Sequence, residues 1–422
     1  MLLLAHSDER GNKTSRRLFA LAWVVWGAMF AFVAFRASKF VFDSNECLIY
    51  GRAAQNWWGR ANLYDLSNID GFLYLPQAAI LYTPFALAGH PLGDVAWRFC
   101  GLSVFCWGLW RLGKILSPAS PKRVFAYATF LAFAPAFNAL RNAQVNLPLA
   151  GLMLHTAVDL AQRRWWRAAA WMTIGLAMKP IMIVMILLAG ACYRGVIRPL
   201  AICLLLLAVF PFLMGPWDYV VSQMQMFFEK LLLAGAPDRL FSDLRSLVGW
   251  LGFMIPMPIY LAMQVAAALV TLWLGIMAVR RWPEPAAATF ILALSASYLM
   301  LFNPRTEGNS YVILTPVLVI PVALMVIENR RREAVLAMIV LTACLTGNLW
   351  AYKLTVHWLK PAACILFVAM MVRELLRGTM QDWAIDRQRA VFAGRRRVHL
   401  QPAAKAASGF SNISKTLVMR QR

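Results

Sequence analysis

The chain has 422 residues, of which 61% are hydrophobic and only 14% charged, and its mean hydropathy is +0.60. A soluble protein carries about a quarter charged residues, so the composition excludes an ordinary soluble enzyme. It predicts instead an all-α protein that crosses a membrane many times. The net charge of +23 does not indicate nucleic-acid binding, because the basic residues gather in short loops between apolar runs.

Apolar runs recur through residues 1–376, which we expect to form one transmembrane domain. The residues before the first run show no cleavage site and indicate a cytoplasmic lead-in, not a signal peptide. The basic tail, 377–422, is predicted to be flexible and to lie on anionic membrane lipid. The predicted spans are residues 18–36, 93–116, 123–138, 147–162, 167–178, 181–193, 199–214, 257–281, 286–302, 311–328, 334–350 and 358–376.

The segment LYLPQAAILYTPFALAG, residues 73–89, is apolar enough to be a thirteenth span. If it crossed the membrane, WRLGKILSPASPKR (residues 110–123) would face outward with its four cations, against the positive-inside rule. If it lies along the surface, most of the 42 Lys and Arg residues face the cytoplasm. This topology places both termini in the cytoplasm and exposes two long outer loops, 37–92 and 215–256.

The first outer loop contains two acidic residues near a predicted helix start. The run ECLIYGRAAQNWW, residues 46–58, has helical periodicity. Asp43 and Glu46 are three residues apart and share a face if the helix starts early, so either carboxylate is a candidate general base. In the alternative interpretations, Asp43 only caps this helix and Glu46 only pairs with Arg52 or Arg98.

A short predicted span ends at a lysine. Residues 167–178 rise only ~18 Å as a helix, against a hydrocarbon core of ~30 Å. Lys179 and Pro180 follow directly, which places the ammonium group below the outer surface. A lysine at this depth is costly unless a wet cavity or an anion receives it. The alternative is a lysine that snorkels to the interface.

The shorter outer turns combine amides with cations. Their polar side chains are Arg141, Asn142, Gln144, Asn146, Arg305, Glu307, Asn309, Lys353 and His357. Amides bond hydroxyl groups, whereas Arg and Lys hold anions, so this set suits a sugar that carries a phosphate. Two simpler interpretations remain open: Arg305 and Glu307 satisfy each other, and His357 is a structural histidine at the interface.

Several short motifs follow one another in a recognisable order between about residues 40 and 320. They are an acidic residue (Glu46 or Asp43), Tyr50, Gly59, Tyr64, Tyr74, Pro76 and Pro84, followed by NAQVNLPLAGLML, GLAMKP and NPRTEGNSYVILTP. Together they resemble glycosyltransferase family 87, of the GT-C superfamily. The family's acid is usually an Asp four residues before the tyrosine. Spacing therefore favours Glu46 and residue type favours Asp43, and the choice stays open.

The resemblance implies a GT-C-type bundle of about twelve transmembrane helices, with membrane-surface helices in the first outer loop, in a bacterial inner membrane. It also implies an inverting transferase, mannosyltransferase-like, that moves a sugar from a polyprenyl phosphate to a lipid or glycan acceptor on the outer face. We expect no metal and no cofactor, and Asp43 or Glu46 as the base. The expected donor-phosphate ligands are Lys179, Arg305, Arg98 and Arg141, and the expected sugar or acceptor contacts are Tyr50, Tyr64, Tyr74, Gln144, Asn146, Glu307, Asn309 and His357.

Other functions fit the sequence less well. The inner loops contain no P-loop, Rossmann fingerprint or paired-Asp motif, which argues against a cytosolic nucleotide-sugar donor. A lipid or polysaccharide transporter without covalent chemistry would spread polar residues through the middle of the bilayer instead of gathering them at one surface. A non-catalytic scaffold would leave the outer amides unexplained.

Overall fold

The computed structural model describes residues 2–39, 45–235, 240–303, 305–346 and 355–377. These residues form sixteen α-helices and two short 3-10 helices, without strands. The predicted tail therefore lies outside the described residues from 378 onward. The elements are α1 (Leu2–Lys39), α2 (Glu46–Trp58), α3 (Pro76–Ala88), α4 (Leu92–Leu116), α5 (Pro121–Arg141), α6 (Asn146–Ala161), α7 (Trp165–Met178), η1 (Pro180–Met182), α8 (Ile183–Cys192), α9 (Arg194–Met214), α10 (Trp217–Gly235), α11 (Leu244–Trp250), α12 (Met257–Arg281), α13 (Glu284–Phe302), η2 (Gly308–Val312), α14 (Thr315–Ile327), α15 (Arg331–Thr346) and α17 (Leu359–Arg377).

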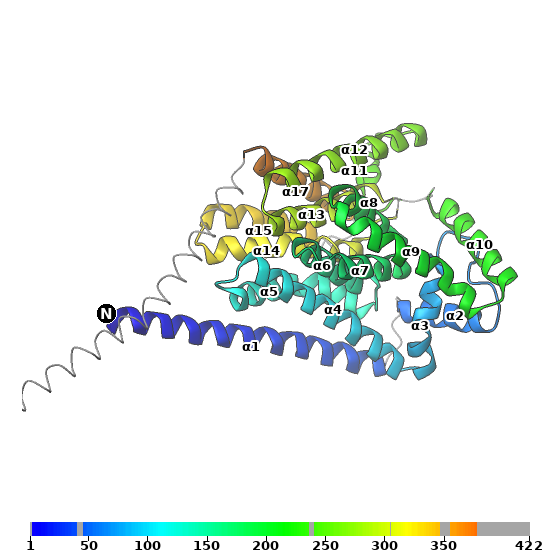
Figure 1. The fold of residues 1–422 in the computed structure, drawn as a ribbon, viewed down its shortest axis with the longest axis horizontal. Helices are drawn as coiled ribbons and strands as arrows, with labels where there is room; N and C mark the ends of the chain where they lie inside the picture. Colours follow the sequence, from blue (N-terminus) through cyan, green and yellow to red (C-terminus); the bar gives the residue numbers. More distant parts are fainter. Residues whose placement is uncertain (1, 40–44, 236–239, 304, 347–354, 378–422) are drawn as a thin grey trace, which may run out of the picture.

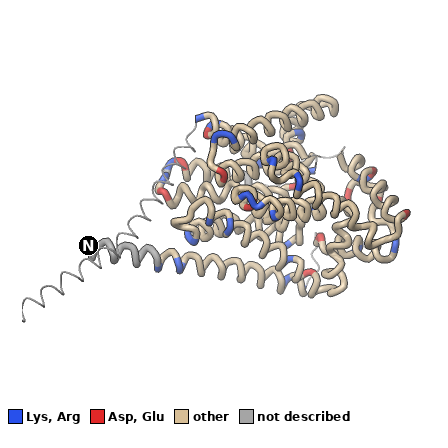
Figure 2. The backbone as a smooth tube through the Cα atoms, in the orientation of Figure 1, with Lys and Arg blue, Asp and Glu red and all other residues tan. Residues whose placement is uncertain are grey.

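Many of these helices have the length and composition of membrane spans. The seven stretches long and apolar enough to cross are Lys13–Lys39, Leu92–Leu116, Pro121–Arg141, Arg194–Met214, Met257–Arg281, Glu284–Phe302 and Gly308–Ile327. Figure 2 shows this pattern in α1, where a long uncharged stretch, residues 18–35, separates basic residues on either side of it. The described residues thus confirm the prediction of an all-α fold and contain seven candidate membrane spans, while the count of twelve spans remains a prediction.

The ambiguous segment 73–89 folds as a short helix. Helix α3 has 13 residues, a length of ~20 Å, which is too short for a hydrocarbon core of ~30 Å. It lies with α2 and α10 at one end of the bundle (Figure 1). This length and position agree with the surface placement that the distribution of basic residues favours.

Glycines bring α4 and α6 into close contact at the centre of the bundle. A Cβ on Gly151 of α6 would lie 2.7 Å from the backbone nitrogen of Phe105 in α4. A Cβ on Gly108 of α4 would lie 2.8 Å from Cβ of Leu154. Small residues at helix crossings let backbones approach closely in membranes. The two helices that begin beside the candidate site are therefore fixed against each other.

We expect Gly151→Ala to destabilise the protein by about 1–3 kcal/mol, because the added methyl group meets backbone atoms that cannot rotate away. The measurement is the thermal unfolding midpoint of the purified protein in detergent. Gly190→Ala in α8 is the matched control, since a Cβ there meets nothing within 4 Å. Equal midpoints for the two variants would show that the α4–α6 contact is looser than described.

Helix α10 holds the segment between α2 and α3 in place. Lys230 of α10 is fully buried and donates to the backbone carbonyls of Asp65 and Asn68, at 2.5 Å each. The side chain of Gln223 accepts from the backbone N–H of Leu63 at 2.9 Å. The carbonyl partners satisfy an ammonium group that would otherwise be costly to bury. Helix α10 thus fixes the irregular chain between α2 and α3, which borders the candidate site.

Candidate active site

The first turn of α2 rests on the turn between α5 and α6. Asn45 is the N-cap of α2, and its side chain accepts from the N–H of Cys47 at 3.2 Å. The same amide donates to Asp94 at 2.8 Å. The N–H of Glu46 donates to the carbonyl of Asn142 at 3.1 Å. These contacts set the position of Glu46, whereas Asp43 lies outside the described residues.

Glu46 is a half-buried carboxyl group among other charges. Burial raises its pKa to about 7, and the negative charge of Glu307 adds to this rise. The positive charges of Lys179 and Arg305 act in the opposite direction. Within the described residues, Glu46 forms no ion pair with Arg52 or Arg98. A carboxyl group with this pKa is half-ionised near neutral pH, as a general base requires.

Lys179 lies at the corner between α7 and η1. Its backbone is extended, with φ −154° and ψ 124°, as expected of a residue that precedes proline. Its ammonium group donates to Oδ1 of Asn146 at 2.7 Å. Nδ2 of Asn146 in turn donates to Oε1 of Gln144 at 2.8 Å and lies 3.4 Å from the hydroxyl of Ser310. The lysine and both predicted amides therefore form one hydrogen-bonded group.

Ser310 extends this group to η2; it lies within the motif NPRTEGNSYVILTP but is not one of the predicted site residues. Its hydroxyl is buried beside Asn146. The motif does not single out this residue, because a serine in a polar turn is common. Only the packing of η2 against the α5–α6 turn shows that it belongs to the site.

Two of the three predicted tyrosines lie near Glu46. The hydroxyls of Tyr50 and Tyr74 are 3.3 Å apart, and the N–H of Val145 donates to the Tyr50 hydroxyl at 3.3 Å. Burial raises the pKa of both tyrosines, and the nearby charge of Glu46 adds to the rise. Tyr64 instead donates to the backbone carbonyl of Tyr74 at 2.7 Å. It supports the loop and is set back from the carboxyl group.

Arg305, in the turn between α13 and η2, contacts the segment between α2 and α3. Its guanidinium donates to the carboxylate of Asp70 at 2.7 Å and to the carbonyl of Ile69. It also lies 5.6 Å from the ring centroid of Phe241. The partner of Arg305 is therefore Asp70 and not Glu307, which is exposed. Asn309, in the same turn, is half-buried.

Three other predicted residues have structural partners. Arg98 is 2% exposed and donates to the carbonyls of Leu140 and Arg141 at 3.1 Å each, so it supports the base of α2. Arg141 has an exposed side chain that donates to Asn142 at 3.2 Å. His357 donates through Nδ1 to the carbonyl of Phe241 at 2.8 Å. The structure does not bring these three side chains to Lys179, and Lys353 lies outside the described residues.

The site thus combines one carboxyl group whose pKa lies near 7, one lysine and a pair of amides. A carboxylate beside a cation can remove a proton from a hydroxyl group while the cation stabilises a departing anion. No group of three or more His, Cys, Asp and Glu side chains in the described part of the chain is arranged to hold a metal ion.

Comparison with known proteins gives one positive result. Residues 72–304 match the family model of glycosyltransferase family 87, which is more than half of the chain. A search of curated proteins gives no match. The matched range contains Gln144, Asn146 and Lys179. It begins after Glu46 and ends one residue before Arg305, so the roles of these two residues depend on the geometry described above.

Proposed function

Since the chain belongs to glycosyltransferase family 87 and is a membrane protein with several candidate spans, we propose that it transfers a sugar from a polyprenyl phosphate to a lipid or glycan acceptor. The observation that carries this proposal is the position of Glu46 and Lys179 in one site, with Asn146 and Gln144 beside the lysine. The group contains a base, an anion ligand and hydroxyl-binding amides, which are the parts that such a reaction needs.

In the proposed reaction, an acceptor hydroxyl attacks the anomeric carbon of the donor sugar. The hydroxyl proton passes to the carboxylate of Glu46. A new carbon–oxygen bond forms as the bond between the anomeric carbon and the phosphate oxygen breaks. The polyprenyl phosphate leaves with the bonding electrons, and a single displacement inverts the anomeric carbon. The ammonium group of Lys179 stabilises the departing phosphate.

The contacts of the predicted phosphate ligands support Lys179 over Arg305 and Arg98. The guanidinium of Arg305 is already engaged with Asp70 and the carbonyl of Ile69, and Arg98 is buried under α2. Among the described residues, the ammonium group of Lys179 has only the neutral amide of Asn146 as its hydrogen-bond partner. We therefore assign the phosphate to Lys179. Arg305 then acts by holding the first outer loop over the site.

The same proposal includes the membrane topology and the substrate class. Twelve spans with both termini in the cytoplasm place Glu46 and Lys179 at the outer surface of a bacterial inner membrane. There the tail of the donor stays in the bilayer while its sugar reaches the amides. In this proposal, Asn146, Gln144 and Asn309 bond the hydroxyls of a hexose, as in a mannosyltransferase.

The test is transfer by the purified full-length protein in lipid vesicles. The vesicles receive radiolabelled polyprenyl-phosphate mannose, polyprenyl-phosphate arabinofuranose or the matching nucleotide sugars, together with a membrane-lipid extract as acceptor. We expect a labelled covalent product only from a polyprenyl-phosphate donor. Transfer from a nucleotide sugar would refute the donor class. Movement of label across the vesicle membrane without a covalent product would indicate a transporter.

A further inference from the structure

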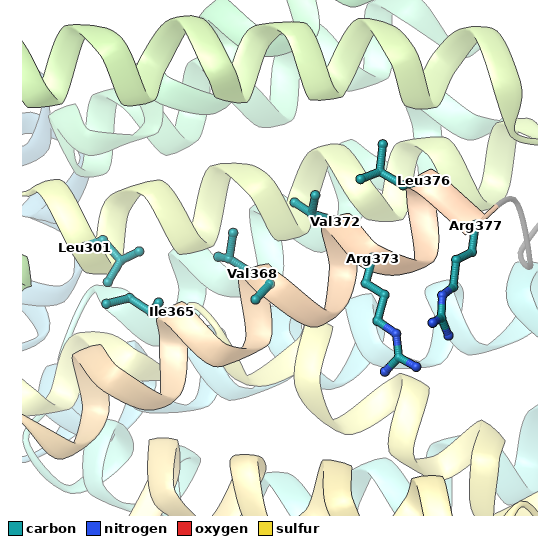
Figure 3. Close-up of a pocket in the computed structure, with 8 residues that line it drawn as sticks. Leu301, Ile365, Val368, Val372, Arg373, Leu376 and Arg377 are labelled. Atoms are coloured by element: carbon teal, nitrogen blue, oxygen red, sulfur yellow. The ribbon is translucent and has the colours of Figure 1, made fainter.

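An apolar groove follows α17, away from the candidate active site. Its volume is about 620 Å³. It is lined by Leu301 of α13 and by a stripe of α17 side chains, seen in Figure 3: Ile365, Val368, Val372 and Leu376. These α17 residues are three or four positions apart and therefore share one face of the helix. The groove is a continuous apolar track along α17, which covers the predicted span 358–376.

The length of the track matches one membrane leaflet. Ile365 and Leu376 are eleven residues apart, which corresponds to a rise of ~16 Å along the helix. Half of a ~30 Å hydrocarbon core is ~15 Å. One hydrocarbon chain of a single leaflet therefore spans the groove from end to end.

The end of the groove carries positive charge. Arg373 and Arg377 line it there, four residues apart, and Figure 3 shows their side chains extending the same way from the last turns of α17. Both are exposed, and neither forms a hydrogen bond or an ion pair with the described residues. Glu374 lies between them in the sequence and is half-buried, so the turn remains net positive. Two exposed guanidinium groups of this kind suit a phosphate.

We propose that this groove binds an anionic phospholipid, with one acyl chain along α17 and the phosphate on Arg373 and Arg377. The opposite end of α17 faces the candidate active site, because Lys360 donates to the carbonyl of Gly308 at 2.7 Å. The arginine pair is therefore at the far end of the helix from the turn that carries Glu307. A donor phosphate at Lys179 and a phospholipid phosphate at Arg373 occupy different membrane ends.

The test uses native mass spectrometry of the purified full-length protein with equal amounts of phosphatidylglycerol and phosphatidylethanolamine of the same chain length. We expect wild type to retain phosphatidylglycerol preferentially. The double variant Arg373→Gln, Arg377→Gln should bind it about thirtyfold more weakly, from the usual contribution of two basic side chains at a membrane surface. The matched control is Arg194→Gln, Arg198→Gln, another exposed arginine pair four residues apart. Equal loss in both double variants, or no loss in either, would overturn the proposal.

A second variant tests the acyl-chain part of the groove. Ala369 also lines it, and Ala369→Phe fills the space while both arginines remain. We expect this variant to lose phosphatidylglycerol as well, with an unchanged unfolding midpoint as the check on folding. Full retention would show that the arginines act without the groove and would overturn the proposed site. Displacement of phosphatidylglycerol by polyprenyl phosphate at equal concentration would overturn the choice of occupant.

Discussion

Replacing Glu46 with Gln is expected to reduce sugar transfer by about 10²- to 10⁴-fold, because the acceptor hydroxyl then loses its general base. In wild type, kcat/KM should rise with pH and level off above about pH 7. The sign follows from the raised pKa of Glu46, which is about 7: the carboxyl group is protonated and inactive below this value and ionised and active above it. The measurement is initial-rate transfer in vesicles between pH 5 and pH 9.

Two further variants test whether the effect is specific to Glu46 and to its charge environment. Glu229→Gln makes the same change at an exposed position of α10 and should leave transfer unchanged. Glu307→Gln removes a negative charge that raises the pKa of Glu46, so the midpoint of the pH profile should fall below that of wild type. A Glu46→Gln enzyme with full activity would assign the base to another group, and Asp43 is then the first to test.

Replacing Lys179 with Met is expected to lower kcat/KM by about 10²- to 10³-fold, the usual effect of removing one group that stabilises a developing anion. The pH profile should also move. The ammonium group lowers the pKa of Glu46, so its loss should shift the midpoint to a pH above that of wild type. The measurements are transfer rates as a function of donor concentration and of pH.

The control for this variant is Lys114→Met. Lys114 is exposed and lies in the last turn of α4, whereas Arg98 lies near the start of that helix. The Lys114→Met enzyme should retain wild-type rates and the wild-type midpoint. A Lys179→Met enzyme with a reduced rate but an unmoved midpoint would contradict the electrostatic contact between Lys179 and Glu46. The lysine would then have a purely structural role at the α7–η1 corner.

The sequence predicts the helical class and the helical character of residues 73–89 because both depend on local properties; their surface position stays a prediction. Apolar run length fixes the helical class, and the distribution of basic residues decides between a span and a surface helix. The corner between α7 and η1 is also predictable from local sequence, since Lys179 precedes a proline at the end of a short apolar run. These features need no knowledge of which helices meet.

The partners of the site residues depend on contacts between segments far apart in the sequence. Arg305 and Glu307 are two residues apart, yet Arg305 pairs with Asp70 of the first outer loop. Nothing in the local pattern of either turn indicates this contact. Arg98 has an outward position in the predicted topology, but its burial under α2 follows from the way Asn45 and Asp94 meet. The residue types in the turns predict a polar site, but which of these residues contact one another depends on tertiary packing.

The most direct test is a density map of the full-length protein in a lipid bilayer with a bound, non-reactive analogue of a polyprenyl-phosphate sugar. We expect a phosphate oxygen within ~3 Å of the Lys179 ammonium group, as in a charge-assisted hydrogen bond. We also expect the anomeric carbon on the side of Glu46, with the amides of Asn146 and Gln144 on the sugar. A phosphate bound at the other membrane end, or a sugar remote from Glu46, would contradict the proposed site.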